Sequence, residues 1–368
     1  RGLGDVYKRQ LSVEVNGDIF HNLHLFANPI DKFRPSDKEI QRALKKKKGS
    51  NLIYFGPGVH NLPNDTLFVP SGTTVYIDGG ARVYGNIFTE GAHDVNIFGR
   101  GEVHPDGRGA GVWVRRSKNV RIDGIVVSQL PIGQCDSVEL TNVKSISYYG
   151  WGDGMDVFSS SNVILDGVFC RNSDDCAAVY ASTQGFKGGS NNVLVKNATL
   201  WADVAHPINI GGHGDPNGMD TVQNVTFRNI DILDQAEKQV DYQGCLAINP
   251  GDNTLVRNIT FENIRIEDFR NGQLVNFRIS FNPKYCVSTG RGIQNVLVKD
   301  VTYNGSGENL SIIAGYDENH KISGIRFVNL VVNGRKITDD MPGKPKWYKT
   351  GDMAGIFVGE HVENLSFE

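Results

Sequence analysis

The sequence predicts an all-β chain wound as a parallel β-helix, a solenoid of short strands. A short motif recurs along it: an Asn or another small polar residue, then a β-branched or apolar residue, then alternation of apolar and polar residues. Glycine is abundant, with 43 residues in 368, as many tight turns require. Alternation with period two inside segments that themselves recur at a longer interval is typical of strands stacked coil upon coil.

The copies of this motif lie 18 to 37 residues apart, and most intervals contain a second short strand such as Ile230-Asp231-Ile232. A β-sandwich would show hairpin spacing without this fixed phase. Leucine-rich and ankyrin repeats are excluded because no helical periodicity separates the strands. We expect the motif heads to form turns and, where they are Asn, to stack as amide ladders between coils. These heads are Asp94, Asn119, Ser137, Asn162, Asn192, Asn224, Asn258, Asn295 and Gly324.

One helix is expected before the solenoid. Ser36-Asp37-Lys38-Glu39 is a capping-box pattern, in which a Ser hydroxyl and a Glu carboxylate satisfy the first free N–H groups of a helix. Ile40, Ala43 and Leu44 then fall on one helical face. A short helix at the open end of a solenoid blocks edge-to-edge pairing of strands, so we interpret it as a cap.

The chain is expected to divide into three parts. Residues 36–368 form the β-helix domain with its capping helix, and residues 1–10 fit no repeat and are interpreted as non-native. Residues 11–35 are too short for a domain and are interpreted as the remnant of an N-terminal β domain. They contain two alternating segments whose apolar side chains point one way, namely Val13, Val15, Leu23 and Leu25.

Composition excludes several classes of function. The net charge is −3, from 38 basic and 41 acidic residues, whereas a nucleic-acid binder normally carries a basic excess. No run reaches the ~18 apolar residues of a membrane span, and no signal peptide is visible. The five cysteines form no Cys-x-x-Cys pair, so we expect no zinc and no other metal or cofactor. We expect a monomer.

One strand of each coil is predicted to present an outward row of small and polar side chains. Triplets such as Met155-Asp156-Val157 and Ile208-Asn209-Ile210 have apolar outer members that point into the coil, so the central members must point out. We call this row the strip, and we expect it to be flat, wettable and suited to a polysaccharide. Its members are Asp156, Ala178, Asn209, Ala247 and Asn276.

Three aspartates converge on this strip. Asp153 and Asp175 each lie three residues before a strip residue, and Asp174 lies one position earlier. Coils stack ~4.8 Å apart, so the three carboxyl groups are neighbours. Paired carboxylates with a water between them are the machinery of inverting glycosidic hydrolysis. Because adjacent carboxylates repel one another, at least one is expected to have a raised pKa and to act as the acid.

Further side chains are expected to hold a sugar. His213 lies in the Gly-rich turn 211–215 at the same edge and is assigned to substrate contact or proton tuning. Trp151, beside Asp153, either stacks on a sugar ring or packs a turn. Arg278 has outward parity and either binds a sugar or pairs with a nearby acid. Within the strip, substrate binding is assigned to Asp156, Asn209 and Asn276.

These motifs resemble those of a known clan of glycoside hydrolases. The Asp153-Gly154-Met155-Asp156 segment, the Asp174-Asp175 pair and Gly212-His213-Gly214 are similar to the signature of family 28, the polygalacturonases. The overall layout of residues 11–368 resembles family 49, the dextranases and isopullulanases, more closely. The passages that carry this second likeness include residues 54–59, 172–175, 274–279 and 332–337. The resemblance implies a right-handed β-helix, an inverting mechanism and, from family 49, a preceding β-sandwich.

Departures from family 28 point to the sugar. That family uses Asn-Thr-Asp where this chain has Trp151-Gly152-Asp153. It also uses an Arg-Ile-Lys segment to bind a galacturonate carboxylate, and this chain has Ala247-Ile248-Asn249 at that place. A site for an acidic sugar should supply a cation. The Gly-His-Gly turn and a slightly longer Asp spacing differ from family 49. We therefore predict a hydrolase of a neutral glycan, dextranase-like, with pectin hydrolysis as the alternative.

In this prediction Asp174 protonates the leaving oxygen, and Asp153 and Asp175 activate the attacking water. The substrate is a polysaccharide or oligosaccharide met outside the bacterial cytoplasm, by a secreted, periplasmic or cell-surface protein. Two rival readings share the solenoid. A polysaccharide lyase would use the acids to bind Ca²⁺ and a cation as base, and the nearby cations are Arg171 and Lys187. A non-catalytic carbohydrate-binding solenoid would need no acid at all.

Overall fold

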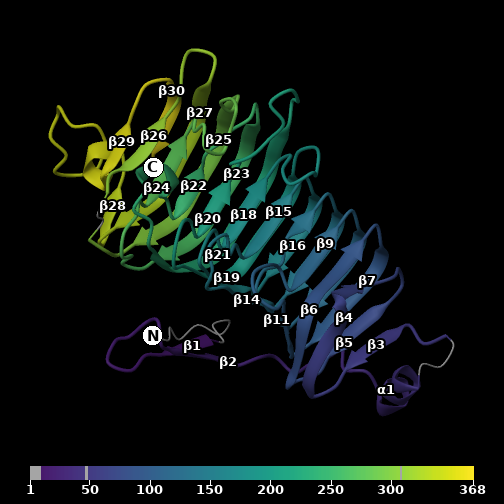
Figure 1. Cartoon of the computed structure of the whole chain (residues 1–368). Helices are drawn as coiled ribbons and strands as arrows, with labels where there is room; N and C mark the ends of the chain where they lie inside the picture. The colour runs from purple at the N-terminus through teal and green to yellow at the C-terminus, as the bar shows by residue number, and fades with distance from the viewer. Residues whose placement is uncertain (1–9, 46–48, 307–308) are drawn as a thin grey trace.

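The computed structural model describes residues 10–45, 49–306 and 309–368. The chain is a parallel β-helix, in which each coil adds one strand to each of three sheets (Figure 1). The predicted fold class is confirmed. The coil interior is filled by one continuous apolar core from Leu62 to Phe367. No helix among the described residues is long and apolar enough to cross a membrane.

The first sheet begins each coil. Its strands are β3 (Leu52–Phe55), β5 (Thr74–Ile77), β7 (His93–Gly99), β10 (Lys118–Asp123), β13 (Asp136–Thr141), β16 (Ser161–Asp166), β19 (Asn191–Ala202), β21 (Thr221–Gln235), β23 (Leu255–Ile266), β25 (Gly292–Tyr303), β27 (Lys321–Val332) and β30 (Val362–Phe367).

The second sheet takes the far halves of the long strands β19, β21, β23, β25 and β27 together with shorter strands. These are β4 (Gly58–Phe68), β6 (Ala81–Glu90), β8 (Glu102–His104), β11 (Val126–Val127), β14 (Lys144–Ile146), β17 (Phe169–Asn172) and the antiparallel β28 (Arg335–Ile337).

The third sheet carries the strip, and it starts from the ends of β4 and β6. Its other strands are β9 (Val112–Arg115), β12 (Ile132–Gly133), β15 (Met155–Phe158), β18 (Ala177–Tyr180), β20 (Ile208–Ile210), β22 (Leu246–Ile248), β24 (Val275–Arg278), β26 (Ser311–Ala314) and β29 (Ile356–Val358). Two 3₁₀ turns, η1 (Val240–Tyr242) and η2 (Gly351–Ala354), lie in loops beside this sheet.

The predicted helix is confirmed as α1 (Asp37–Leu44), with both capping-box hydrogen bonds between Ser36 and Glu39. It lies at the N-terminal end of the solenoid beside β3, as a cap would (Figure 1). Ile40 is buried against that end, whereas Leu44 is exposed. The basic run Lys45–Lys48, at the helix end, lies outside the described residues except for Lys45.

The strands β1 (Gln10–Val13) and β2 (Leu23–Phe26) form a separate antiparallel hairpin. Their partly buried side chains, His24 and Phe26, pack on Phe169 of β17. The predicted apolar face is present but points to solvent, with Leu11 paired to Leu25 and Val13 to Leu23, all exposed. A larger β domain would cover this face, and we retain that origin as a proposal. The predicted non-native segment 1–10 lies outside the described residues except for Gln10.

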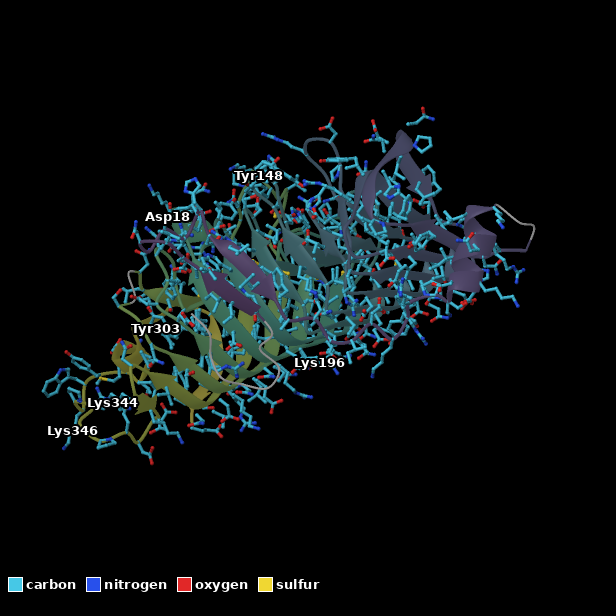
Figure 2. All side chains as sticks on the ribbon, turned by 90° about the horizontal axis from the view of Figure 1, so that it is seen from below. Asp18, Tyr148, Lys196, Tyr303, Lys344 and Lys346 are labelled. Carbon is cyan, nitrogen blue, oxygen red and sulfur yellow. The ribbon has the colours of Figure 1, made fainter. Side chains whose placement is uncertain are left out.

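The hairpin continues into a strap, residues 19–31, that runs along the second sheet; Figure 2 shows the hairpin, in purple, laid across the strands of the solenoid. Side chains from several coils hold it. Arg171 Nη2 donates to Ile19 O at 2.7 Å, and Lys144 Nζ donates to Asn28 Oδ1. Farther along, Arg100 Nη2 donates to Pro29 O at 3.4 Å and Tyr76 Oη to Asp31 Oδ2 at 2.6 Å.

The motif heads form corners within the strands of the first sheet. All nine have left-handed backbone, with φ from 54° to 72°, a region that Asn, Asp and Gly tolerate and most residues avoid. Their amides also join coils: Asn192 Nδ2 donates to Asn162 Oδ1 at 2.7 Å, and Asn258 Nδ2 donates to Asn224 Oδ1 at 3.2 Å. The predicted turn role and the amide ladder are confirmed.

Replacing Asn192 tests which property of the corner matters. Asn192→Ala loses the amide hydrogen bond and strains a left-handed backbone, whereas Asn192→Gly loses only the hydrogen bond and relieves the strain. We expect the alanine variant to be less stable than the glycine variant by about 1 kcal/mol. Thermal unfolding followed by circular dichroism measures the difference. An alanine variant that melts at or above the glycine variant would show that φ does not limit this corner.

Candidate active site

The predicted register of the strip is correct. Asp156 pairs with Ala178, Ala178 with Asn209, Asn209 with Ala247, and Ala247 with Asn276, each one coil apart. The expectation of a wettable surface is wrong, because loops cover the strip. Asp156 is 3% exposed and Asn209 is 9% exposed, while Ala247 and Asn276 have no exposed surface.

The three catalytic candidates lie together at one edge of the third sheet. Asp153 ends the loop before β15, and Asp174 and Asp175 lie in the loop before β18. The Gly154 N–H donates to Asp175 O at 2.7 Å, so the two loops run side by side with the register of the sheet. The charge of Asp175 raises the pKa of both Asp153 and Asp174, and Asp153 also raises the pKa of Asp174.

Glycine permits this close approach. A Cβ at Gly154 would stand 2.2 Å from Cys176 O and 2.6 Å from Asn172 Oδ1, closer than real atoms allow. A Cβ at Gly152 would stand 2.4 Å from Ser173 Oγ. Asn172 ties the loops further, since its amide donates to Asp153 O at 3.2 Å and to Ser147 Oγ at 3.0 Å. Any side chain at Gly152 or Gly154 would push the acid loops apart.

Asp175 is a buried carboxylate with every hydrogen-bonding position occupied. Its Oδ1 accepts from the backbone N–H of His206 at 3.1 Å and lies 2.7 Å from His206 Nδ1. Its Oδ2 accepts from Tyr180 Oη at 2.5 Å and from Asn209 Nδ2 at 2.7 Å. Burial alone would raise the pKa of Asp175, but His206, Tyr180 and Asn209 outweigh it and hold the pKa below its usual range. Asp175 is therefore a fixed negative charge.

The other two acids respond to that charge. Burial first, and then repulsion from Asp175 and Asp153, raises the pKa of Asp174 to about 8. Burial and the charge of Asp175 raise the pKa of Asp153 to about 6, against a hydrogen bond from Asp156 that lowers it. Asp156 is fully buried, and burial together with its three acidic neighbours raises its pKa well above the usual range. The cluster therefore keeps one anion and at least one neutral acid together near pH 7.

Sequence reasoning missed His206, whose side chain is 2% exposed and contacts Asp175. The signal was present in the register. Asp153 and Asp175 lie three residues before Asp156 and Ala178, and the same offset from Asn209 gives His206. Tyr180 was also missed; it points out two residues after Ala178 and donates to Asp175. In the described structure His206 Nε2 has no hydrogen-bond partner.

Two binding candidates lie within reach of the acids, although His213 follows β20 and so lies at the opposite edge of the third sheet from them, not at the same edge as predicted. His213 packs the edge of its ring on Tyr180, with ring centres 5.1 Å apart, and burial lowers its pKa against the opposing influence of Asp175 and Asp252. Trp151 is 66% exposed and has a left-handed backbone, with φ of 62°. Its ring meets the ring of Tyr285 edge to face, with centres 6.2 Å apart. Its exposure leaves room for a sugar, and sugar stacking by Trp151 stays a prediction.

Three strip side chains make their contacts within the protein, so the assignment of Asp156, Asn209 and Asn276 to substrate binding is wrong. Asp156 hydrogen-bonds to Asp153, and the Asn209 amide donates to Asp175 and to Tyr180 Oη. Asn276 is fully buried, and its amide donates to Gln273 Oε1 at 2.9 Å and to the loop carbonyl Val240 O. None of these donors faces an open surface on which a sugar could lie.

Three cations near the site are already engaged. Arg278 pairs with Asp241, the local-acid alternative for this residue. Arg171 pairs with Asp203 at 2.8 Å and holds the strap, while Lys187 pairs with Asp215 at 3.1 Å. The two candidate bases of a lyase therefore make structural contacts.

The residues around this site match a known family. The model for glycosyl hydrolases family 28 matches residues 111–341, more than half of the chain, and includes all three acids and His206. The chain belongs to glycosyl hydrolase family 28. This family 28 chain is 26% identical over 295 residues to a polygalacturonase of Juniperus ashei, across 71% of its own length and 54% of that protein. It spans about half the length of the curated relatives it matches.

Solved structures confirm the fold. The family 28 exopolygalacturonase of Yersinia enterocolitica superposes with a TM-score of 0.65 over 94% of this chain and 79% of that one, at 14% identity. Dex49A of Penicillium minioluteum superposes with a TM-score of 0.55 over 78% of this chain and 56% of that one, at 16% identity. The predicted clan is confirmed. Within it, the matching family model is that of family 28, whereas the sequence predicted a closer likeness to the layout of family 49.

The raised pKa of Asp174 predicts a pH-dependent gain in stability for Asp174→Asn. The unfolded chain releases this proton near pH 3.8, while the folded chain keeps it until about pH 8. The contribution of Asp174 to stability is therefore complete below pH 3.8 and is lost as the pH rises toward 8. We expect Asp174→Asn to exceed the wild type by about 1 kcal/mol or more at pH 8, and by much less at pH 4.

Thermal unfolding at pH 4 and pH 8 measures this difference. Asp106→Asn, which removes an exposed acid, is the control and should change stability equally little at both pH values. A gain for Asp174→Asn that does not grow with pH would contradict the electrostatic account of the cluster.

Proposed function

We propose that this family 28 chain hydrolyses glycosidic bonds in a pectic substrate, a galacturonate-containing polysaccharide or oligosaccharide, with inversion of configuration. The observation that carries the proposal is the division of charge among three carboxyl groups at one point, with Asp174 neutral beside the fixed anion Asp175. Hydrolysis with general acid and base catalysis needs one protonated and one ionised carboxyl group together.

Each acid has a distinct role in this proposal. Asp174, neutral at pH 7 and partly exposed, protonates the oxygen of the leaving sugar. Asp153, with a pKa of about 6, is ionised at pH 7 and accepts the proton of the attacking water. The lone pairs of the Asp175 carboxylate already accept hydrogen bonds, so Asp175 does not take up a proton during the reaction. It acts instead as the fixed negative charge that keeps Asp174 protonated. Burial of the cluster strengthens each of these interactions.

Membership of family 28 and the names of its relatives, which include polygalacturonases, support a pectic substrate over the neutral glycan that the sequence favoured. The Arg and Lys missing at Ala247 and Asn249 remain the strongest objection. Two cations lie nearby: Arg278 is already paired with Asp241, and Lys284 offers the substitute. Arg278 stands beside Asn249 one coil farther along, where Asn249 Nδ2 donates to Arg278 O.

Lys284 is the second cation, on the loop that follows β24. Its Nζ lies 4.8 Å from the ring centre of Tyr285 and 5.9 Å from that of Tyr242. It is exposed, and it makes no ion pair within the described part of the chain. An unpaired ammonium group held over two rings, one of which contacts Trp151, is suited to receive a sugar carboxylate.

Asp174→Asn should lower kcat by at least ~100-fold while the fold is kept, because the amide cannot protonate the leaving oxygen. In the wild type, the rate should fall below about pH 6 as Asp153 is protonated, and above about pH 8 as Asp174 ionises. Reducing-end release from polygalacturonate across this pH range measures both effects, and NMR of the first product gives its anomeric configuration. Near-normal turnover in Asp174→Asn, or an initially retained anomer, would contradict the mechanism.

Lys284→Gln should raise KM for polygalacturonate several-fold, with little change in kcat, if this side chain receives the sugar carboxylate. The same variant should bind methyl-esterified substrate as the wild type does, since the ester carries no charge. Lys346→Gln is the matched control, because Lys346 lies at the far end of the solenoid (Figure 2). An equal rise in KM for both substrates would remove Lys284 from carboxylate recognition.

A further inference from the structure

Two loops from opposite edges of the third sheet meet above the strip. Loop 236–245 precedes β22 and contains η1, so it rises at the edge that carries the acids. Loop 279–291 follows β24 and rises at the other edge, the edge of His213. For these loops to touch, they must together span the length of a four-residue strand, about 13 Å.

Several contacts hold the loops together over the strip. Asn282 Nδ2 donates to Tyr242 Oη, and Arg278 pairs with Asp241. The rings of Tyr242 and Tyr285 meet edge to face, with centres 5.1 Å apart. Cys286 Sγ donates to Gly212 O at 3.4 Å, which lays loop 279–291 along the turn of His213.

The crossing continues to the loop of the catalytic candidates. Tyr285 also meets Trp151, which lies two residues before Asp153. The strands β15 and β24 are four strand spacings apart, about 19 Å, so loop 279–291 folds back over β22, β20 and β18 to make this contact. We call Trp151, Tyr242 and Tyr285 the roof.

Beyond the roof, the strip is filled by protein. An added Cβ at Gly244 would stand 2.9 Å from the Asn276 Cβ and 3.2 Å from the Ala247 Cβ, so loop 236–245 rests directly on both residues. Neither residue has exposed surface. A sugar chain cannot continue over β22 and β24 without displacing this loop.

On the other side of the acids, the same outward row reaches the surface. It passes through Pro131, which is buried, and becomes accessible at Trp113, Phe88 and Phe68, since Phe88 pairs with Trp113 and Phe68 with Phe88. These three rings stack with centres 6.4 and 5.4 Å apart, and Arg115 lies over Phe88 and Trp113. Phe68 is 64% exposed, and Trp113 and Phe88 are partly exposed.

We propose that this protein acts on chain ends. The roof and loop 236–245 close the strip just past the acids, so the terminal sugar units lie beneath Trp151 and Tyr285. The rest of the chain leaves over Trp113, Phe88 and Phe68, whose apolar edges suit the faces of sugar rings. This inference rests on the proposed hydrolysis and adds its mode, exo rather than endo.

The experiment compares bond cleavage with loss of viscosity on polygalacturonate. An exo enzyme releases small products while viscosity falls slowly. We expect the wild type to release one short product from the start. In Trp151→Ala and Tyr285→Ala, viscosity loss per bond cleaved should rise several-fold, because the roof no longer stops the chain. Tyr148→Ala is the matched control: Tyr148 lies on the same loop as Trp151, is 88% exposed, and has no contact with the roof.

A wild type that gives mixed long products and a fast viscosity loss would overturn the proposal. A binding measurement separates this failure from failure of the hydrolysis itself. Calorimetry of Asp174→Asn, which holds substrate without cleaving it, should give at least 10-fold weaker binding of an oligogalacturonate blocked by a bulky group at both ends. Equal binding of blocked and free oligosaccharides would overturn chain-end recognition, whether or not the wild type cleaves bonds.

Discussion

The fixed register between coils is the constraint on which the rest of this structure depends. Left-handed corners at the motif heads bend the first-sheet strands at the same point of every coil, and the amide ladder keeps neighbouring corners aligned. Because of this alignment, Asp153, Asp175 and His206 fall in one row although 53 residues separate the first from the last, as their numbers show. The catalytic candidates are positioned by the backbone, and short rigid loops, with Gly152 and Gly154, only bring them closer.

Within that frame, electrostatics assigns the protonation states. Four hydrogen-bond contacts neutralise the cost of burying Asp175 as an anion, and the anion in turn makes ionisation of Asp174 and Asp153 unfavourable. Repulsion among these carboxyl groups lowers the stability of the folded protein, and an uncharged polar site would avoid it. Such a loss of stability is common at functional sites. His206 and Tyr180 are as important to this arrangement as the acids, since they decide which carboxyl group is ionised.

Local and periodic features could be predicted from the sequence. The solenoid, the strand register, the helix cap at Ser36 and the convergence of three acids all follow from alternation, spacing and capping chemistry. The covering of Asn276 and Ala247 could not be predicted in this way, because it depends on the paths of long loops that no period constrains. The choice between families 28 and 49 failed because the overall layout of residues 11–368 was weighted above a family 28 motif that is short but specific. The missing cations at Ala247 and Asn249 then favoured a neutral glycan. His206 was accessible to register reasoning, yet a histidine between Ala205 and Pro207 carries no local signal.

The strap has a consequence for how this protein unfolds. In a solenoid each coil contacts only its neighbours, so coils can fray one after another from an end. Arg171, Lys144, Arg100 and Tyr76 instead bind successive points of one segment, with partners as far as 152 residues apart in the chain. Unfolding of one coil in this stretch therefore weakens the binding of the strap to the other coils. The strap converts a row of nearest neighbours into a single cooperative block, and that block contains the coils that carry the acids.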